Sequence, residues 1–343
     1  MFRAACLLLL GALSPSFSVA AAEPAKPIKV FILAGQSNME GKAKVSLLDY
    51  QAGQEATKAI YQPYRTAEGQ WIERGDVMVK FLDRQGKLTV GFGSPKSVGP
   101  ELGFGKVVGD RYEEPVLLIK TAWGGRSLYR DFRSPSAGLP QDEVLQKMLA
   151  DAQKRKPDAK MEEIKEAFGA SYRAMLKEVA DTLADLKKVV PDYQNQGYEL
   201  AGFAWFQGWN DMISPDYTAE YTANLKHFIR DVRRDLKAPK LPFVVGQMGV
   251  DGLHASEGVK RFKDAQAAVL EEQEFAGNVA LVKTDAFWDT EAEAVFKKGW
   301  RQNIEEWNKV GSDFPFHYLG SGKTMLKIGE GLGKAMLELR GDK

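Results

Sequence analysis

Five short apolar runs recur along this chain, and stretches with the spacing of amphipathic helices separate several of them. Each run is continuously apolar instead of alternating between apolar and polar residues, as is typical of strands buried on both faces. The runs are Ile28–Ala34, Val116–Thr121, Leu200–Phe206, Phe243–Gly249 and Val279–Thr284. Strands that alternate with helices predict an α/β fold with a parallel sheet covered by helices on both sides.

Two helices are predicted most clearly. Ser214-Pro215-Asp216 combines an N-cap residue, a proline for the first turn and an acid near the positive end of the helix dipole. Apolar residues follow it at helical spacing up to Leu236. The pattern over Lys323–Leu339 predicts a second helix that closes the chain.

Two segments do not fit the strand–helix alternation. Val77–Leu82 and Leu88–Phe92 alternate around Arg84-Gln85-Gly86-Lys87, which predicts a β-hairpin insertion near residues 77–92. Residues 131–170 are rich in charge, proline and alanine and predict a charged helical insertion. Each insertion is open to two interpretations, as surface decoration or as a lid that shapes the substrate site.

The N-terminus has the pattern of a signal peptide. Arg3 precedes an apolar run from Ala4 to Leu13 that is too short to span a bilayer, and small residues for cleavage follow it. We expect a signal peptide over residues 1–22, cleaved after Ala20 or Ala22, and a periplasmic or extracellular protein. The remaining residues, 23–343, are about 320 in number and fit one domain with insertions.

Charge and cysteine content exclude several functions. The chain has 47 Lys and Arg against 46 Asp and Glu, so nothing indicates binding to nucleic acid or to an anionic membrane. Its single cysteine lies within the predicted signal peptide. The mature chain therefore has no disulfide, no thiolate nucleophile and no cysteine metal ligand. The oligomeric state cannot be read from the sequence.

A serine follows the first apolar run at a position suited to catalysis. The run ends at Gly35, and Ser37 comes two residues later in Gly35-Gln36-Ser37-Asn38-Met39. Open α/β sheets place their chemistry at the carboxyl ends of the strands. Ser37 is therefore a candidate nucleophile, provided that the chain supplies a base and donors for an oxyanion.

Three histidines compete for the role of the base. His227 lies within a predicted amphipathic helix and His254 lies in a glycine-rich loop after the fourth apolar run. His317 follows Asp313-Phe314-Pro315-Phe316, where a proline-containing turn can bring the Asp313 carboxylate back to the imidazole. We therefore predict that His317 is the base.

Two further strand ends carry potential oxyanion donors. The second run ends in Ala122-Trp123-Gly124-Gly125-Arg126-Ser127, where Gly124 and Gly125 let backbone N–H groups approach a ligand closely. The third run ends in Gln207-Gly208-Trp209-Asn210-Asp211, where the side-chain amides of Gln207 and Asn210 can donate.

Together these segments resemble the conserved blocks of SGNH hydrolases, in the form found in sialate O-acetylesterase-like proteins and family 6 carbohydrate esterases. Gly35–Met39 resembles the first block, Ala122–Gly125 the second, Gln207–Asp211 the third and His317 the fourth. The resemblance implies a flavodoxin-like three-layer α/β/α sandwich with a five-stranded parallel sheet. It also implies a metal-free and cofactor-free serine esterase that removes O-acetyl groups from carbohydrates.

The resemblance also assigns roles to residues. Ser37 would be the nucleophile, His317 the base and acid, and Asp313 the residue that orients His317. The Ser37 N–H, Gly125 or Gly124, and Asn210 with Gln207 would hold the oxyanion. The residues expected to contact substrate are Trp123, Arg126, Trp209 and Tyr318, with Glu40 nearby.

One position departs from the family pattern. The family places its acid three residues before the histidine, and that position is Phe314 in this chain. Asp313, Asp285 at the end of the fifth run, and a Ser–His dyad with a backbone acceptor all remain open. Two other functions also remain open, a non-catalytic glycan-binding protein on the same scaffold and an esterase for other acyl groups.

Overall fold

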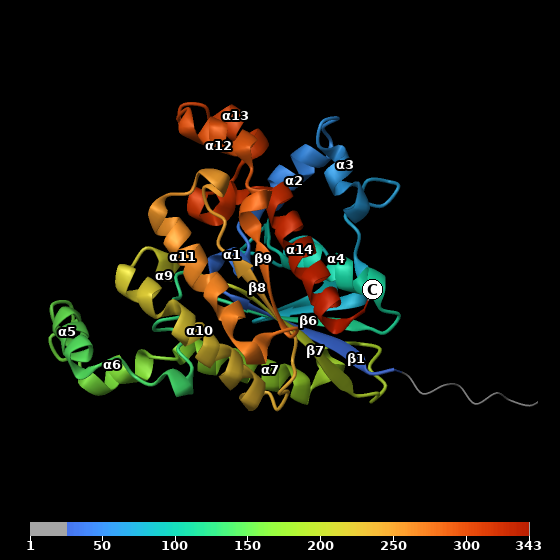
Figure 1. Ribbon diagram of the computed structural model, residues 1–343. Helices are drawn as coiled ribbons and strands as arrows, with labels where there is room; N and C mark the ends of the chain where they lie inside the picture. Colours follow the sequence, from blue (N-terminus) through green and yellow to red (C-terminus); the bar gives the residue numbers. More distant parts are fainter. Residues whose placement is uncertain (1–25, 343) are drawn as a thin grey trace, which may run out of the picture.

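The computed structural model describes residues 26–342 (Figure 1). Its strands are β1 (Ile28–Gly35), β2 (Ala43–Lys44), β3 (Arg74–Phe81), β4 (Arg84–Leu88), β5 (Ser97–Val98), β6 (Val116–Ala122), β7 (Tyr198–Phe206), β8 (Phe243–Gln247) and β9 (Val279–Lys283). Its α-helices are α1 (Ser37–Glu40), α2 (Val45–Ala52), α3 (Lys58–Tyr61), α4 (Glu101–Arg111), α5 (Asp142–Gln153), α6 (Met161–Ala167), α7 (Ala170–Ala184), α8 (Leu186–Val189), α9 (Trp209–Met212), α10 (Pro215–Asp235), α11 (Glu257–Ala267), α12 (Thr290–Lys297), α13 (Ile304–Val310) and α14 (Gly322–Arg340). The predicted signal peptide, residues 1–22, lies outside the described residues. Across residues 26–342, no helix has the length and apolar character needed to cross a membrane.

A mostly parallel sheet of seven strands forms the centre of the molecule, in the order β4-β3-β6-β1-β7-β8-β9. The five predicted apolar runs form β6, β1, β7, β8 and β9, and all of these pair in parallel. Both predicted helices are also confirmed, as α10 and α14. Ser214 caps α10 by accepting a hydrogen bond from the Tyr217 N–H.

The predicted number of five strands was wrong, because β3 and β4 extend the same sheet. β3 pairs in parallel with β6, and β4 pairs antiparallel with β3 at the sheet edge. The predicted turn and second strand of the hairpin were also wrong. The chain reverses at Leu82 and Asp83, so the residues taken as the turn form β4. Burial of Phe81 and Leu88 fixes this register, whereas the prediction relied on Gly86 as a turn residue.

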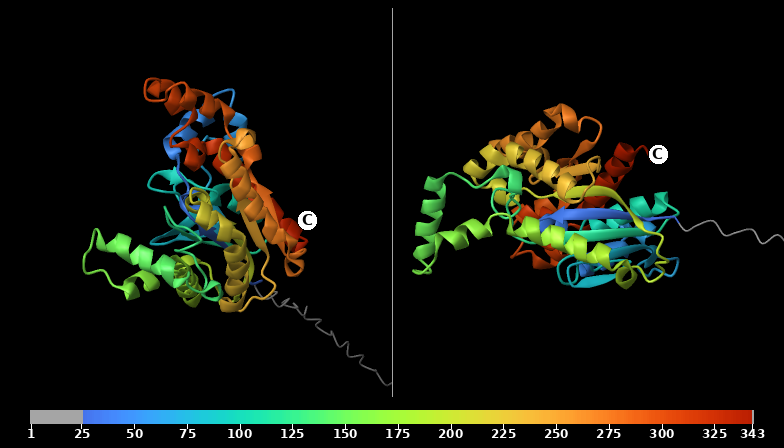
Figure 2. Two further views of the ribbon diagram at one scale, coloured as in Figure 1. Left: turned by 60° about the vertical axis from the view of Figure 1, so that its left-hand side comes forward. Right: turned by 90° about the horizontal axis from the view of Figure 1, so that it is seen from below.

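Helices cover both faces of the sheet (Figures 1 and 2). Two successive residues of β7, Gly202 and Phe203, show the two sides. Phe203 packs against Phe228 of α10 with ring centroids 5.9 Å apart. A Cβ on Gly202 would lie 2.2 Å from the sulfur of Met336 in α14, so Gly202 faces the opposite helix layer. Helices α4 and α14 lie on this second side, and α7 and α10 on the first.

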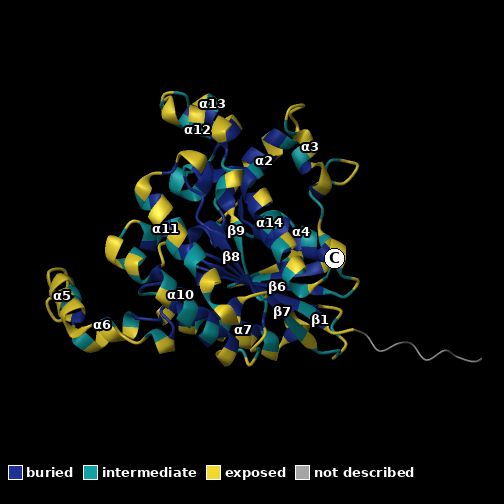
Figure 3. Cartoon of the chain, viewed as in Figure 1, coloured by how far each residue is buried: buried dark blue, intermediate teal, exposed yellow. Residues whose placement is uncertain are grey.

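The charged segment over residues 131–170 contains α5 and α6, which project from the rest of the molecule (Figure 1). Much of their surface is exposed (Figure 3). A small apolar cluster joins the two helices to the body through the side chains of Leu145, Ile164, Phe168 and Tyr129. This cluster is separate from the main core around the sheet.

A buried ion pair supports the carboxyl end of the sheet. The Lys120 Nζ in β6 lies 2.6 Å from Glu101 Oε2 in α4, and both side chains are fully buried. Lys120 also donates to the carbonyl oxygens of Glu40 at 2.7 Å and Phe92 at 2.8 Å, so its three N–H groups all have acceptors. Burial lowers the pKa of Lys120, and the Glu101 carboxylate opposes that shift. Lys120 thus fixes the backbone at the end of α1.

We expect Lys120→Met to lower the free energy of unfolding by about 3–5 kcal/mol, because it leaves the Glu101 carboxylate buried without its partner. Lys106→Met is the matched control. Lys106 forms a partly exposed pair with Asp110, and both lie on α4, the helix that carries Glu101. Loss of this pair should cost less than about 1 kcal/mol. Adding Glu101→Gln to Lys120→Met should recover part of the loss. Urea denaturation measures all of these, and equal costs for the two lysine variants would contradict the role given to Lys120.

Candidate active site

The register of three neighbouring strands brings the predicted motifs together. Gly35 at the end of β1 pairs with Ala122 at the end of β6 and with Phe206 at the end of β7. Ser37, Gly124 and Asn210 each follow one of these strand ends by two to four residues. All three segments therefore meet at the carboxyl edge of the sheet, where open α/β folds place their sites.

Ser37 is the first residue of the short helix α1. Its backbone N–H lacks an intrahelical acceptor, as does every N–H in the first turn of a helix. The approach to Ser37 requires glycine, because a Cβ on Gly35 would lie 2.1 Å from the Phe206 carbonyl oxygen. The strand thus ends in contact with its neighbour, and the chain turns directly into α1.

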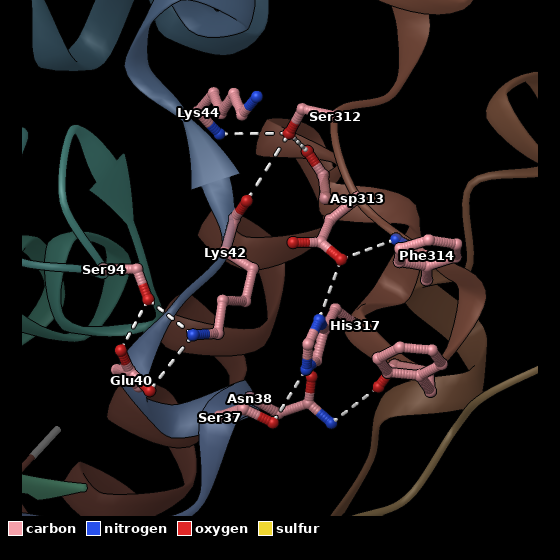
Figure 4. A network of polar contacts seen from close by, with 12 residues as sticks. Ser37, Asn38, Glu40, Lys42, Lys44, Ser94, Ser312, Asp313, Phe314 and His317 are labelled. Atoms are coloured by element: carbon pink, nitrogen blue, oxygen red, sulfur yellow. Dashed lines mark hydrogen bonds and ion pairs between the residues drawn. The ribbon is translucent and has the colours of Figure 1, made fainter. Parts of the chain in front are cut away.

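Ser37, His317 and Asp313 form a continuous hydrogen-bonded chain (Figure 4). His317 Nε2 lies 2.9 Å from Ser37 Oγ, and His317 Nδ1 lies 2.9 Å from Asp313 Oδ1. When the proton of the imidazole is on Nδ1, that nitrogen donates to Asp313 and Nε2 accepts from the serine hydroxyl. This is the arrangement that nucleophilic serine chemistry requires.

The turn that carries His317 has a strained backbone. Tyr318 and Leu319 follow His317 in η7 (Pro315–Gly320) with φ angles of 53° and 61°, which non-glycine residues rarely adopt. Both side chains are fully buried, and the Tyr318 hydroxyl lies 2.6 Å from Thr284 Oγ1 and 2.7 Å from the Gly249 N–H. Packing around Tyr318 therefore holds the strained turn in place.

Of the acids left open by the sequence, Asp313 contacts His317. Burial raises the pKa of Asp313, but hydrogen bonds from His317 and from the Phe314 N–H outweigh it and hold this pKa below its usual value. Asp313 is therefore ionised near neutral pH. Asp285 instead forms an ion pair with Lys263. The structure does not join it to His317.

The other two histidines lie elsewhere. His227 Nδ1 in α10 lies 3.0 Å from Ser136 Oγ, and His254 is exposed in the short helical turn Gly252–His254. Neither contacts Ser37. Within residues 26–342, no three His, Cys, Asp or Glu side chains gather as ligands of a metal ion would.

The prediction that Gln207 donates to an oxyanion was wrong. Gln207 is fully buried, and its Nε2 lies 3.1 Å from Gln36 Oε1, 3.0 Å from the Arg126 carbonyl oxygen and 2.6 Å from Asp211 Oδ2. Its Oε1 accepts from the Tyr221 hydroxyl. With these partners, the Gln207 amide connects the three strand ends and has no donor left for a substrate.

Asn210 remains available as a donor, because Gln36 orients its amide. Gln36 Nε2 donates to Asn210 Oδ1 at 3.3 Å, so the Nδ2 group of Asn210 faces away from that contact. Gln36 Oε1 in turn accepts from the Gly208 N–H at 3.1 Å. Of the two glycines, Gly124 lies close to the candidate nucleophile, because a Cβ on Gly124 would be 3.8 Å from Ser37 Cβ. Nothing lies within 4 Å of the equivalent position on Gly125, whose φ of 71° suits glycine.

The residues expected to contact substrate divide into two groups. Trp123, Arg126 and Trp209 are partly or fully exposed near the strand ends. The prediction for Tyr318 was wrong, because its side chain is fully buried and its hydroxyl bonds to protein groups. Glu40 lies beside the site, where Lys42 and Ser94 contact its carboxylate (Figure 4).

Sequence reasoning missed two positioning residues, Gln36 and Asp211. The Asp211 side chain is fully buried and accepts from the Leu128 N–H at 2.9 Å, the Tyr129 N–H at 2.8 Å and Gln207. It therefore ties the loop after β6 to the segment after β7. Both residues lie inside the recognised motifs. Their place directly beside a candidate nucleophile or donor is the sequence signal that could have identified them as positioning residues.

Comparison with known proteins finds a matching family and a shared fold. A family model for carbohydrate esterases, described as sialic acid-specific acetylesterases, matches residues 27–296. Among solved structures, a protein from Arabidopsis thaliana is 17% identical with a TM-score of 0.53, over 91% of this chain and 98% of that one. A carbohydrate acetylesterase from Xanthomonas citri is 12% identical with a TM-score of 0.50, over 92% of this chain and 57% of its own. At these identities the two structures show a shared fold alone. No curated protein sequence gave a significant match.

We expect Asp211→Asn to destabilise the protein, because the new NH₂ group would face backbone and side-chain donors. Each donor left without an acceptor costs about 1–3 kcal/mol. Burial raises the pKa of Asp211 to about 7, so the folded state holds this proton more tightly than the unfolded state does. The stability from this group is then lost as pH rises from about 4 to 7, and the cost of the substitution should be smaller at pH 7 than at pH 5.

Urea denaturation at the two pH values measures this cost. Asp264→Asn, at an exposed position in α11, is the control and should change little at either pH. An unchanged stability of Asp211→Asn would contradict the bracing role of Asp211. An equal cost at pH 5 and pH 7 would contradict its raised pKa.

Proposed function

The chain belongs to the carbohydrate esterase family of sialic acid-specific acetylesterases, and we propose that it removes O-acetyl groups from carbohydrates through a serine-bound acetyl intermediate. As a member of this family it is a carboxylic ester hydrolase. The observation that carries the proposed mechanism is the chain of two 2.9 Å contacts from Ser37 through His317 to Asp313.

In the first half of the reaction, His317 Nε2 takes the proton of the Ser37 hydroxyl as its oxygen attacks the acetyl carbonyl carbon. Asp313 holds the imidazole in the required tautomer and stabilises the imidazolium that forms. Because hydrogen bonds keep the pKa of Asp313 low, its carboxylate is ionised when His317 becomes protonated.

The tetrahedral oxyanion needs donors fixed in place before the reaction. We assign this role to the Ser37 N–H, to the backbone N–H of Gly124 or Gly125, and to Asn210 Nδ2. His317 then gives its proton to the leaving sugar oxygen, and the acetyl group stays on Ser37. His317 then takes a proton from water as the water attacks this ester, and it returns the proton to Ser37 Oγ as acetate leaves.

Two further parts of the proposal concern architecture and location. We propose that the five parallel strands from β6 to β9, with the helices on their two faces, correspond to the flavodoxin-like SGNH hydrolase sandwich, with additions near residues 77–92 and 131–170. We also propose that residues 1–22 direct export and that residues 23–343 act outside the cytoplasm.

We expect Ser37→Ala to lower kcat for acetate release from an acetylated sugar by about 10⁴-fold or more, since it removes the nucleophile. The far-ultraviolet circular dichroism spectrum and the melting temperature should stay close to those of the unmodified protein. A fluorophosphonate probe should label the unmodified protein at Ser37, as mass spectrometry of its peptides would show. Turnover that survives the substitution, or labelling at another serine, would rule out Ser37 as the nucleophile.

A matched pair of substitutions tests the acid. Asp313→Asn should lower kcat by roughly 10²- to 10⁴-fold, because the amide no longer fixes the tautomer of His317. Asp285→Asn should leave kcat within about twofold, since Asp285 pairs with Lys263 away from the histidine. Steady-state kinetics on 4-nitrophenyl acetate separates the two. A larger loss for Asp285→Asn would return the acid to one of the alternatives that the sequence left open.

A further inference from the structure

A cleft of about 900 Å³ lies between the α12–α13 pair and α2, beside the acid of the proposed triad. Trp300 and Ile304 line one wall, and Leu47 and Tyr50 line the other. Asp313 and the next residue, Phe314, also line the cleft. The volume of the cleft is at the upper end of the range for pockets that bind small organic molecules.

Aromatic rings connect this cleft to the proposed catalytic histidine. The Trp300 ring meets the edge of Phe314 with centroids 6.0 Å apart, and Phe314 stacks on Phe316 at 5.3 Å. Phe316 in turn lies 4.4 Å from the His317 ring and 5.4 Å from Trp209. A continuous aromatic surface therefore runs from the cleft to the segment that carries Asn210.

The lining of the cleft is exposed to an unusual degree for large apolar side chains. Tyr50 is 38% exposed, Phe314 41% and Ile304 44%, and all three line the same cleft. Apolar side chains that are exposed singly need no explanation, but a group of them around one hollow marks a binding surface.

Polar groups of mixed character surround the aromatic surface. Lys44 and Lys309 bring positive charge, Glu305 brings negative charge, and Asn308 can both donate and accept hydrogen bonds. A sugar ring matches this combination, since its C–H faces pack on aromatic rings while its hydroxyls donate and accept. Because the charges are of both signs, the cleft favours a neutral sugar over a polyanion.

We propose that the cleft binds a further sugar unit of the carbohydrate whose acetyl ester reacts at Ser37. The substrate is then an acetylated oligosaccharide or polysaccharide instead of a free acetylated sugar. This inference rests on the proposed function. It extends beyond the family match, because that match ends at residue 296 and α13 and Phe314 lie after it. Contacts to the distant sugar unit would strengthen binding of the ester beside Ser37 and so lower KM.

The test is a chain-length series. Chemically acetylated mono-, di-, tri- and tetrasaccharides of the gluco, manno and xylo series are compared with 4-nitrophenyl acetate as a substrate that lacks any sugar. For the series cleaved fastest, we expect kcat/KM to rise roughly tenfold from the monosaccharide to the trisaccharide, mainly through a lower KM, as apolar contact area is added.

Substitutions on opposite walls locate the effect. In Trp300→Ala and in Tyr50→Ala, the ratio of kcat/KM between trisaccharide and monosaccharide should fall towards one. The ratio cancels any general change in activity, and the second wall covers the case in which Trp300→Ala loosens the helices around it. Tyr198→Ala is the matched control, because Tyr198 is similarly exposed but begins β7 at the opposite end of the strand from Asn210.

Each outcome either supports or overturns the proposed sugar subsite. Equal kcat/KM along every series, or a chain-length ratio that survives both wall substitutions, overturns the subsite while leaving the esterase proposal intact. Cleavage of 4-nitrophenyl acetate without cleavage of any acetylated saccharide overturns the carbohydrate substrate and the subsite together. A ratio lost in both wall variants and kept in Tyr198→Ala supports the subsite.

Discussion

The pairing of β1 between β6 and β7 is the constraint on which the site depends. Because Gly35 lies opposite both Ala122 and Phe206, three loops leave the sheet at the same level. A shift of one residue in either pairing would turn the side chains to the other face and separate the proposed nucleophile from its proposed donors. Gln36 and Gln207 stabilise this arrangement at the carboxyl ends of the strands. Their amides bond to each other at 3.1 Å and to groups on neighbouring loops. Two buried side chains thus determine where Ser37 and Asn210 lie.

The histidine side of the site is held in a different way. His317 comes from a segment 280 residues after Ser37, so no strand pairing fixes it. Its position depends on a turn with two residues in the left-handed conformation, Tyr318 and Leu319. The buried Tyr318 side chain stabilises this turn. Asn38 adds a link from the other direction, because its Nδ2 donates to the Phe316 carbonyl oxygen at 3.1 Å. The cost of the strained turn is therefore offset by packing and hydrogen bonds outside the reacting groups.

The sequence could predict features that depend on local pattern. Continuous apolar runs identified five strands, and the Ser214 cap and its proline identified the start of α10, since such signals act within a few residues. Gln207 and Tyr318 show where this reasoning fails. Gln207 lies in a recognised motif and Tyr318 follows His317 directly. Whether an amide or a ring faces the substrate or the interior depends on partners far away in the sequence, such as Gln36 and Thr284. The extension of the sheet by β3 and β4 was missed for the same reason, because alternation in a short hairpin does not say which strand lies beside it.

The departure from the family pattern at Phe314 and the aromatic cleft are parts of one feature. In the family pattern that the sequence resembles, the acid is expected three residues before the histidine. The proposed acid of this chain, Asp313, stands four residues before it, with Pro315 between. The extra residue does not break the contact, because the turn brings Asp313 Oδ1 within 2.9 Å of His317. Phe314 then stands at the position where that pattern expects the acid, and the Phe314 ring stacks on Phe316 and faces Trp300. With the proposed acid one position earlier, an aromatic ring lies beside the proposed triad, in the lining of the cleft that we propose for a second sugar unit.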